Sequence, residues 1–193
     1  MILMDDYLKD FGLLEKDLVG KRILDEGAGL RMFARDCVEE EVGEVWSMAK
    51  DIEDWWATKE RMELAERQNP RSEWLAIWKE VEKKSQRGVF QNLPYADESF
   101  DLVLSRYALA QAIGSVEEMF LAMQESVRVL VHGGEARYFP GWTDNWPEEQ
   151  KAVVLAALYR MSQLPGVRVE VKRVEISIGG LKNIGSLVVL HKD

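Results

Sequence analysis

The residues best suited to hold a ligand stand together between positions 22 and 30, in the stretch Arg-Ile-Leu-Asp-Glu-Gly-Ala-Gly-Leu. An apolar run leads to Asp25, and Gly27 and Gly29 follow before a stretch of helical periodicity, an order that predicts a strand, a tight turn and a helix. Glycines reach positive φ and leave their backbone open to a ligand, and the helix start offers free N–H groups. Two glycines alone fit an ordinary strand-to-helix turn equally well, so the neighbouring segments must decide between the two interpretations.

The elements that would position this turn alternate along the chain. Apolar periodicity predicts helices over 5–18, 30–38, 52–68, 72–84, 115–131 and 147–163, and strands over 22–26, 43–48, 88–91, 100–105, 135–139, 167–172 and 187–190. This alternation predicts an α/β fold with a doubly wound, mostly parallel seven-stranded sheet, an antiparallel last strand and helices on both faces. Ligands of such sheets bind beyond the carboxyl ends of the strands, which would bring residues 25–31, 49–51, 91–93 and 105–107 to one crevice.

Composition limits the classes of function. A chain of 193 residues with 47% hydrophobic content can fill one sizeable core, so we expect a single domain over 1–193, with an N-terminal helix within 1–18 and an inserted helix within 70–87. The net charge of −9 argues against a nucleic-acid partner.

The sequence predicts neither a metal site nor a membrane segment. Cys37 is the only cysteine and lies on the apolar face of its helix, and His132 and His191 have no neighbours of metal-ligand type. The N-terminal residues lack a basic region followed by a long apolar run, and no run is long enough to cross a membrane. These observations favour a cytoplasmic location.

Three segments together resemble a known family. They are residues 23–29, residues 93–105 with the sequence Leu-Pro-Tyr-Ala-Asp-Glu-Ser-Phe-Asp-Leu-Val-Leu-Ser, and residues 127–135. In this order and spacing they are similar to the successive motifs of class I S-adenosylmethionine-dependent methyltransferases, and within that superfamily to the small-molecule type typified by ubiquinone and menaquinone biosynthesis enzymes. The resemblance covers residues 20–140 and implies a Rossmann-like fold, S-adenosylmethionine as the cofactor and a small-molecule acceptor.

The resemblance also implies roles for individual residues. Asp25, Gly27, Ala28 and Gly29 would lie beside the methionine part of the cofactor, with the glycines giving access to the backbone. The other implied cofactor-binding residues are Asp51 at the ribose, Gln91, Asn92 and Leu93 at the adenine, and Ser105 at the methionine part. The implied acceptor-binding residues are Arg106, Tyr107 and Trp142.

Two positions near the glycine turn depart from the family pattern. Arg31 stands in place of the third glycine, where a long cation would either crowd the cofactor or hold a carboxylate. Glu26 stands where the family usually has a buried aliphatic residue. Because a charge inside a central strand is costly unless it is paired, we predict a basic or hydrogen-bonding partner for Glu26, with Arg31 or Arg106 as the candidates.

The adenosine end of the expected site departs as well. Ala49 stands where a carboxylate normally accepts the two ribose hydroxyls, and Asp51, two residues further on, is the candidate substitute. Val89 replaces the acid that usually contacts the adenine amine. Each lost charge-assisted hydrogen bond is worth about 1.5–3 kcal/mol, so these replacements bear directly on affinity for the cofactor.

Two functions of different classes follow. The first is methyl transfer to a small molecule, in which the chain holds donor and acceptor in line; Tyr107, Tyr138 and Asp144 could serve as a general base, although a structural role is the commoner one for each. The second is a catalytically inactive, methyltransferase-like binding or regulatory protein, with tryptophan pairs at 55–56, 74 and 78, and 142 and 146 as partner surfaces. A homo-oligomer or a protein partner is compatible with either function. Residues 1–18, 70–87 and 141–147 are expected to shape the acceptor pocket.

Overall fold

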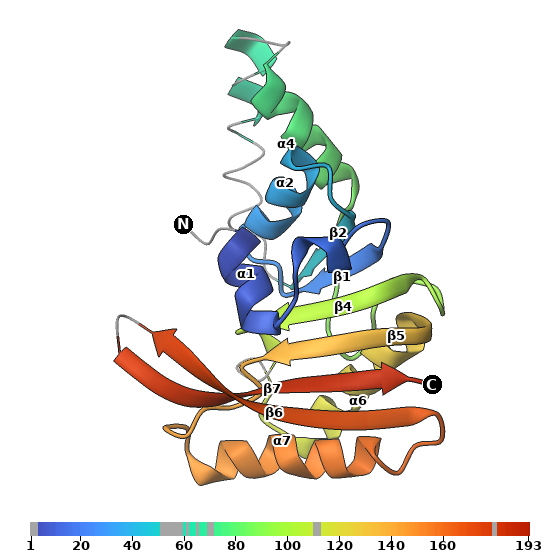
Figure 1. Ribbon diagram of the computed structural model, residues 1–193. Helices are drawn as coiled ribbons and strands as arrows, with labels where there is room; N and C mark the ends of the chain where they lie inside the picture. Colours follow the sequence, from blue (N-terminus) through green and yellow to red (C-terminus); the bar gives the residue numbers. More distant parts are fainter. Residues whose placement is uncertain are drawn as a thin grey trace.

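A single sheet organises the molecule. The computed structural model describes residues 4–50, 60, 62–64, 66–68, 72–109, 113–178 and 181–193. Within them seven strands form one sheet in the order β3-β2-β1-β4-β5-β7-β6 (Figure 1). The strands are β1 (Arg22–Glu26), β2 (Glu44–Ala49), β3 (Ser85–Arg87), β4 (Phe100–Arg106), β5 (Leu130–Phe139), β6 (Val167–Ile178) and β7 (Leu181–Lys192). The pairs among β1 to β5 are parallel and β7 runs antiparallel to β5 and β6, which confirms the predicted fold class.

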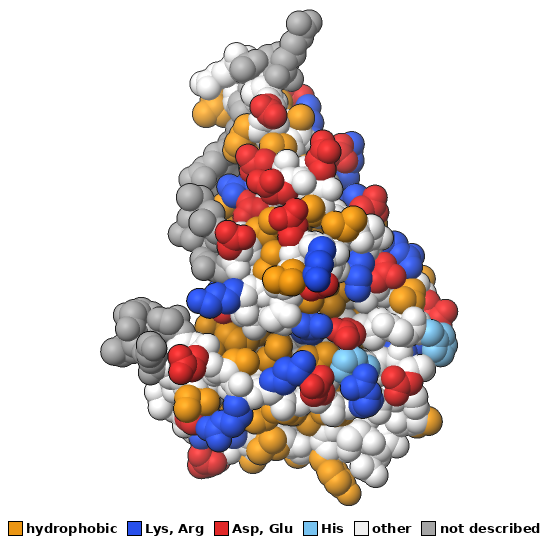
Figure 2. Space-filling model, viewed as in Figure 1, with side chains coloured by type: hydrophobic (Ala, Val, Ile, Leu, Met, Phe, Trp, Pro, Cys, Tyr) orange, Lys and Arg blue, Asp and Glu red, His pale blue; other side chains and the backbone are white. Residues whose placement is uncertain are grey.

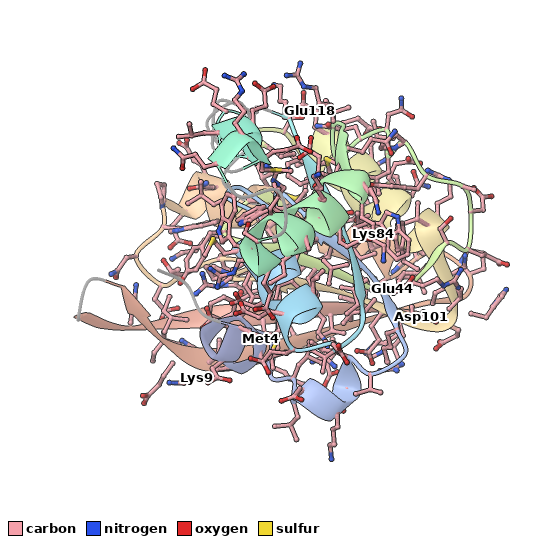
Figure 3. All side chains as sticks on the ribbon, turned by 90° about the horizontal axis from the view of Figure 1, so that it is seen from above. Met4, Lys9, Glu44, Lys84, Asp101 and Glu118 are labelled. Carbon is pink, nitrogen blue, oxygen red and sulfur yellow. The ribbon has the colours of Figure 1, made fainter. Side chains whose placement is uncertain are left out.

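Helices cover both faces of this sheet. They are α1 (Met4–Phe11), α2 (Met32–Glu39), α4 (Glu73–Lys83), α6 (Val116–Val129) and α7 (Glu148–Met161). Successive residues of β1 show the division, because Ile23 packs with α1, α2 and α4 whereas Leu24 packs with α6 and α7. Seen from above, α1, marked by Met4 and Lys9, lies beside α2 (Figure 3), and the Met4 backbone N–H donates to Asp36 of α2 at 3.0 Å.

Local sequence signals account for the starts of two helices. The hydroxyl of Ser72 accepts from the backbone N–H of Leu75 at the start of α4, at 3.2 Å. The hydroxyl of Ser115 accepts from the backbone N–H of Glu118 at the start of α6, also at 3.2 Å. Each cap satisfies an N–H that has no partner within its own helix.

Three predicted boundaries are wrong. The helix expected over 5–18 ends at Phe11, because Gly12 turns the chain with φ of +63°, and a short 3₁₀ helix follows at Glu15–Asp17. The third strand is Ser85–Arg87 rather than 88–91, and it pairs with β2. The helix expected to reach residue 131 ends at Val129, and β5 begins at once with Leu130.

The last two strands are longer than predicted. β5 pairs with β7 only through residues 188–191, and the remainder of β7 continues beyond that contact paired with β6 (Figure 1).

The predicted helix over 52–68 falls largely outside the described residues. Cys37 is 1% exposed, as its place on an apolar helix face predicts. Among the described residues no helix combines the length and the apolar character that a membrane span requires.

Candidate functional site

A pocket of about 590 Å³ opens at the carboxyl ends of β1 and β4. The turn after β1, the first turn of α2, the end of β4 and one residue of α1 form its walls. Its lining residues are Tyr7, Asp25, Gly27, Ala28, Gly29, Leu30, Met32, Phe33, Arg106 and Tyr107. The carboxyl ends of parallel strands are where the sequence predicts a site, and six of the predicted ligand-binding residues meet there.

The two glycines of the turn serve different purposes. Gly27 has φ of +77°, and a Cβ at this position would lie 2.2 Å from the Cβ of Ala108, so only glycine fits. Gly29 has φ of +48°, and apart from its two chain neighbours no described residue has an atom within 4 Å of the place where its Cβ would stand. The N–H groups of Gly27 and Ala28 both donate to the carbonyl of Met48 in β2, at 2.7 and 3.1 Å. The turn is therefore fixed to the sheet at Gly27 and open toward the pocket at Gly29.

Asp25 places a carboxyl group in the pocket wall. It is 1% exposed, and the hydroxyl of Tyr7 on α1 donates a hydrogen bond to it. The ring of Tyr7 is held in turn by stacking on Phe33 of α2, with the ring centroids 4.3 Å apart. Burial raises the pKa of Asp25 to about 7, although the Tyr7 hydrogen bond and the charge of Arg106 act in the opposite direction. The Asp25 carboxyl group therefore changes its charge near neutral pH.

Arg106 forms the cationic side of the pocket. Its Nε donates to Oδ2 of Asp10 on α1 at 2.7 Å. The guanidinium carbon lies 5.5 Å from the ring centroid of Tyr7 and 5.1 Å from that of Tyr107, within the range of cation–π attraction. α1 is thus joined to the site by two polar links, Tyr7 to Asp25 and Asp10 to Arg106.

Two residues beside the pocket have a left-handed backbone, which is uncommon outside glycine. Tyr107 has φ of +54°, and its N–H donates to the carbonyl of Phe139 at 2.7 Å. Arg31 has φ of +56° at the start of α2. Such conformations cost about 1–3 kcal/mol and occur often at functional sites.

Arg31 does not crowd the pocket. Its guanidinium donates to Oε2 of Glu82 at 2.8 Å and to the hydroxyl of Ser85 at 3.2 Å, and it lies over the ring of Trp78 at 5.7 Å. Of the two outcomes that the sequence left open, the arginine holds a carboxylate, and that carboxylate belongs to the protein.

Glu26 has a hydrogen-bonding partner, but neither predicted candidate is that partner. The hydroxyl of Ser126 on α6 donates to its Oε1 at 2.9 Å. Side chains alternate along β1, so Glu26 and Asp25 point to opposite faces of the sheet. Arg31 and Arg106 lie on the face of Asp25, with α4 and α1, and are therefore out of reach of Glu26. The choice of candidates was wrong because side chains alternate along a strand.

The remaining predicted ligand residues that the structure describes lie outside this pocket. Gln91 lines a different depression of about 540 Å³ beside α6, and Asn92 forms an isolated bridge with Val89. Leu93 is buried in the core cluster that includes α6, and its N–H donates to Glu125 at 2.8 Å. Asp51 is outside the described residues.

Ser105 and Trp142 also have structural partners. The hydroxyl of Ser105 accepts from the N–H of Leu109 at 3.3 Å, at the end of β4. Trp142 packs against the α6 and α7 core, and its backbone N–H donates to the hydroxyl of Ser186 at 2.9 Å. Ala49 ends β2, so a carboxylate at the ribose position is not supplied by this strand.

The sequence predicts that residues 1–18 help to shape the pocket, but it does not identify the residues of α1 that do so. Tyr7 lines the pocket and bonds to Asp25, 18 residues away, and Asp10 accepts from Arg106 of the pocket wall, 96 residues away. The only signal in the sequence is the amphipathic pattern of the N-terminal segment, which fits both packing on the core and covering a site. Tyr7 does both, because its ring is buried and its hydroxyl reaches Asp25.

Comparisons with known proteins agree with this architecture. The family model described as "Methyltransferase domain" matches residues 57–137. A search of curated protein sequences finds no match.

Solved structures share the fold at low sequence identity. TrmN from Thermus thermophilus is 17% identical with a TM-score of 0.57, over 98% of this chain and 48% of that chain. The [4+2]-cyclase SpnF is 18% identical with a TM-score of 0.53, over 89% and 58%. An arsenic(III) S-adenosylmethionine methyltransferase from Chlamydomonas reinhardtii is 19% identical with a TM-score of 0.54, over 91% and 64%. The present chain therefore spans about half to two thirds of the length of these proteins.

The strand order, the glycine turn after β1 and the matched methyltransferase domain lead to one conclusion. The chain has the fold of class I S-adenosylmethionine-dependent methyltransferases, and its residues 57–137 match the methyltransferase-domain model.

Proposed function

We propose that this protein transfers a methyl group from S-adenosylmethionine to a small-molecule acceptor. The observation that carries the proposal is the pocket at the ends of β1 and β4, where a buried carboxyl group and an open glycine turn face the same space. Its volume of about 590 Å³ is within the usual range for small ligands and cofactors.

The pocket fits the methionine end of the cofactor. Asp25 offers a carboxylate to the ligand's ammonium group, and the unobstructed backbone at Gly29 lets the ligand approach closely. Arg31, which could have blocked this approach, is held by Glu82. At the ribose end, Ala49 offers no hydrogen bond, and Asp51 is the proposed substitute. Gln91, Asn92, Leu93 and Ser105 stay predicted cofactor contacts.

When bound, S-adenosylmethionine supplies a methyl group on a sulfonium centre that is already activated for transfer. The protein's task is then to bind, orient and exclude water. The rings of Tyr7, Phe33 and Tyr107 give the pocket apolar walls, which favours an apolar acceptor body. Arg106, held by Asp10, gives the acceptor a single cationic contact. We assign no general base.

The alternative function is that of a catalytically inactive binding or regulatory protein. The fold is shared with a protein named as a [4+2]-cyclase, so the fold by itself does not fix the reaction. Trp74 on α4 is 42% exposed, whereas Trp78 is buried and Trp142 and Trp146 pack against the core. Trp74 is therefore the described tryptophan best placed to serve a binding or regulatory protein that lacks catalysis.

Isothermal calorimetry with S-adenosylhomocysteine tests the proposal. The measurement is made at pH 8, above the Asp25 pKa of about 7, so that the carboxyl group is charged. We expect binding to the wild type and a loss of about 10- to 100-fold in Asp25→Asn, because one charge-assisted contact is removed.

Asp101→Asn is the matched control, since Asp101 lies at the opposite end of the sheet, where it accepts from the backbone of Arg22 at 2.8 Å. Equal affinities of all three proteins would contradict the assignment of Asp25. Lack of binding at millimolar ligand would reject the methyltransferase proposal in favour of the binding protein.

A further inference from the structure

Behind the glycine turn, on the sheet face opposite the pocket, lies a buried acidic group that the family pattern does not contain. Glu26 is the last residue of β1, immediately before Gly27, and it is 0% exposed. Its Oε1 accepts from Ser126 of α6 at 2.9 Å. Its Oε2 is equally buried and has no hydrogen-bond partner among the described residues.

The groups around Glu26 supply no positive charge to offset an ionised form. The charged groups that act on it are Asp25 on its own strand and Glu125 on α6, and both are acidic. The facing titratable groups from the β3–β4 loop and from β5 are Tyr95 and Tyr138, whose buried hydroxyls also have no partner within the described part of the chain.

The donor and acceptor inventory favours the acid form of Glu26. An ionised carboxylate only accepts hydrogen bonds, and a buried one without a cation is costly. A carboxylic acid instead carries an O–H donor, which a tyrosine hydroxyl oxygen can accept. Consistent with this, burial raises the pKa of Glu26 to about 8, with the charges of Asp25 and Glu125 acting in the same direction and Ser126 against it.

The position of Glu26 connects this cluster to the pocket. Glu26 pairs with Met48 in the register of β1 and β2, and the carbonyl of Met48 accepts the N–H groups of Gly27 and Ala28. A shift of Glu26 would therefore move the first half of the turn. Gly27 has little freedom to adjust, because Ala108 fills the space above it.

We propose that Glu26 is a positioning residue that works as a neutral carboxylic acid, joining the end of β1 to Ser126 of α6 and holding the glycine turn in its ligand-binding shape. Ionisation of Glu26 draws the carboxylate toward water and displaces the turn. Ligand affinity in the pocket then falls although Glu26 touches no ligand. The part of the proposal that concerns ligand affinity rests on the proposed function; the part that concerns the protonation state does not.

The first experiment measures urea unfolding as a function of pH for the wild type and for Glu26→Gln, which keeps the acceptor for Ser126 but cannot ionise. Because the folded-state pKa is raised from 4.5 to about 8, the stabilising effect of the acid form is complete below the lower value and is lost as pH rises to the upper one. We expect the urea midpoint of Glu26→Gln, relative to wild type, to rise over this window and to level off above it.

Two further variants keep the unfolding test decisive. Glu149→Gln removes an exposed carboxylate at the start of α7, and its profile should run parallel to that of the wild type. Ser126→Ala removes the hydrogen bond that favours ionisation, so the pH-dependent loss should end at a higher pH than in the wild type. Parallel profiles for wild type, Glu26→Gln and Ser126→Ala would overturn the proposal.

The second experiment measures the dissociation constant of S-adenosylhomocysteine near pH 7 and near pH 9. We expect the wild type to lose about tenfold in affinity relative to Glu26→Gln between these conditions, which corresponds to one pKa unit of coupling. An identical pH dependence in the two proteins would overturn the link to the pocket. If neither protein binds the ligand at any pH, the proposed function fails, and the unfolding profiles still decide the protonation state of Glu26.

Discussion

Substituting alanine for either of two glycines separates backbone strain from ligand contact. Gly20 precedes β1 and Gly29 follows it, and both have positive φ, at +71° and +48°. At neither position does a described residue other than the chain neighbours have an atom within 4 Å of an added Cβ. Only Gly29 lines the pocket. Gly20→Ala is therefore a control that carries the same kind of backbone strain at the opposite end of the strand.

The expected loss of stability is small and similar for the two variants. A left-handed backbone costs alanine about 1–2 kcal/mol, and the reduced entropy of the unfolded chain returns about 0.4–1 kcal/mol. The net loss is up to about 1.6 kcal/mol, which for a chain of this length lowers the melting temperature by at most about 6 °C. Both variants should therefore be folded at 25 °C.

The expected loss of ligand affinity differs between the variants. A methyl group at Gly29 enters the space where the ligand meets the backbone, and such overpacking costs about 1–3 kcal/mol, or about 5- to 150-fold in affinity. Calorimetry with S-adenosylhomocysteine should show this loss in Gly29→Ala, with Gly20→Ala equal to the wild type. Equal affinities for Gly29→Ala and the wild type would refute the assignment of the open turn to ligand binding.

Three further predictions follow from the site. Gly27→Ala should destabilise the protein by about 2–5 kcal/mol in urea unfolding, because backbone strain and a 2.2 Å clash add together; a loss below about 1 kcal/mol would contradict the observed packing. Tyr7→Phe removes the donor that lowers the Asp25 pKa, so NMR titration should show this pKa above about 7. The loss of stability that accompanies ionisation of Asp25 should then continue to a higher pH than in the wild type. An unchanged titration would argue against the hydrogen bond. Arg31→Ala leaves Glu82 without its buried partner and should lower stability while ligand affinity at pH 8 changes less than in the Asp25 variant; the reverse ranking would place Arg31 in the binding site.

The turn after β1 could be predicted from the sequence because the information that specifies it is local. Asp25, Gly27 and Gly29 stand within five residues, and their types dictate a strand end and a turn whatever packs around them. The parallel sheet follows from the alternation of apolar strands and amphipathic helices. The sequence could therefore predict the fold and the position of the pocket in advance.

Pairings between distant residues could not be predicted in the same way. Arg106 bonds to Asp10 and Glu26 to Ser126 across 96 and 100 residues, and such choices depend on how elements pack. Alternation along β1 was the missed clue, since it sends Asp25 and Glu26 to opposite faces.

The predicted bounds of the third strand were wrong for a related reason. β3 consists of Ser85, Gln86 and Arg87, a short polar edge strand, so it lacks the apolar pattern that identifies a strand. These residues form a strand because they pair with β2, and the hydrophobic pattern of the sequence does not show that pairing.

The most direct test of the account is a crystal structure of the protein grown with S-adenosylhomocysteine. The account predicts the ligand in the pocket at the ends of β1 and β4, with its amino group at Asp25 and its chain against the backbone of Gly29. Clear density for the ligand elsewhere would contradict it. The account would also be contradicted if calorimetry showed saturation under the crystallisation conditions but the crystal pocket held no ligand and Tyr7 was still bonded to Asp25.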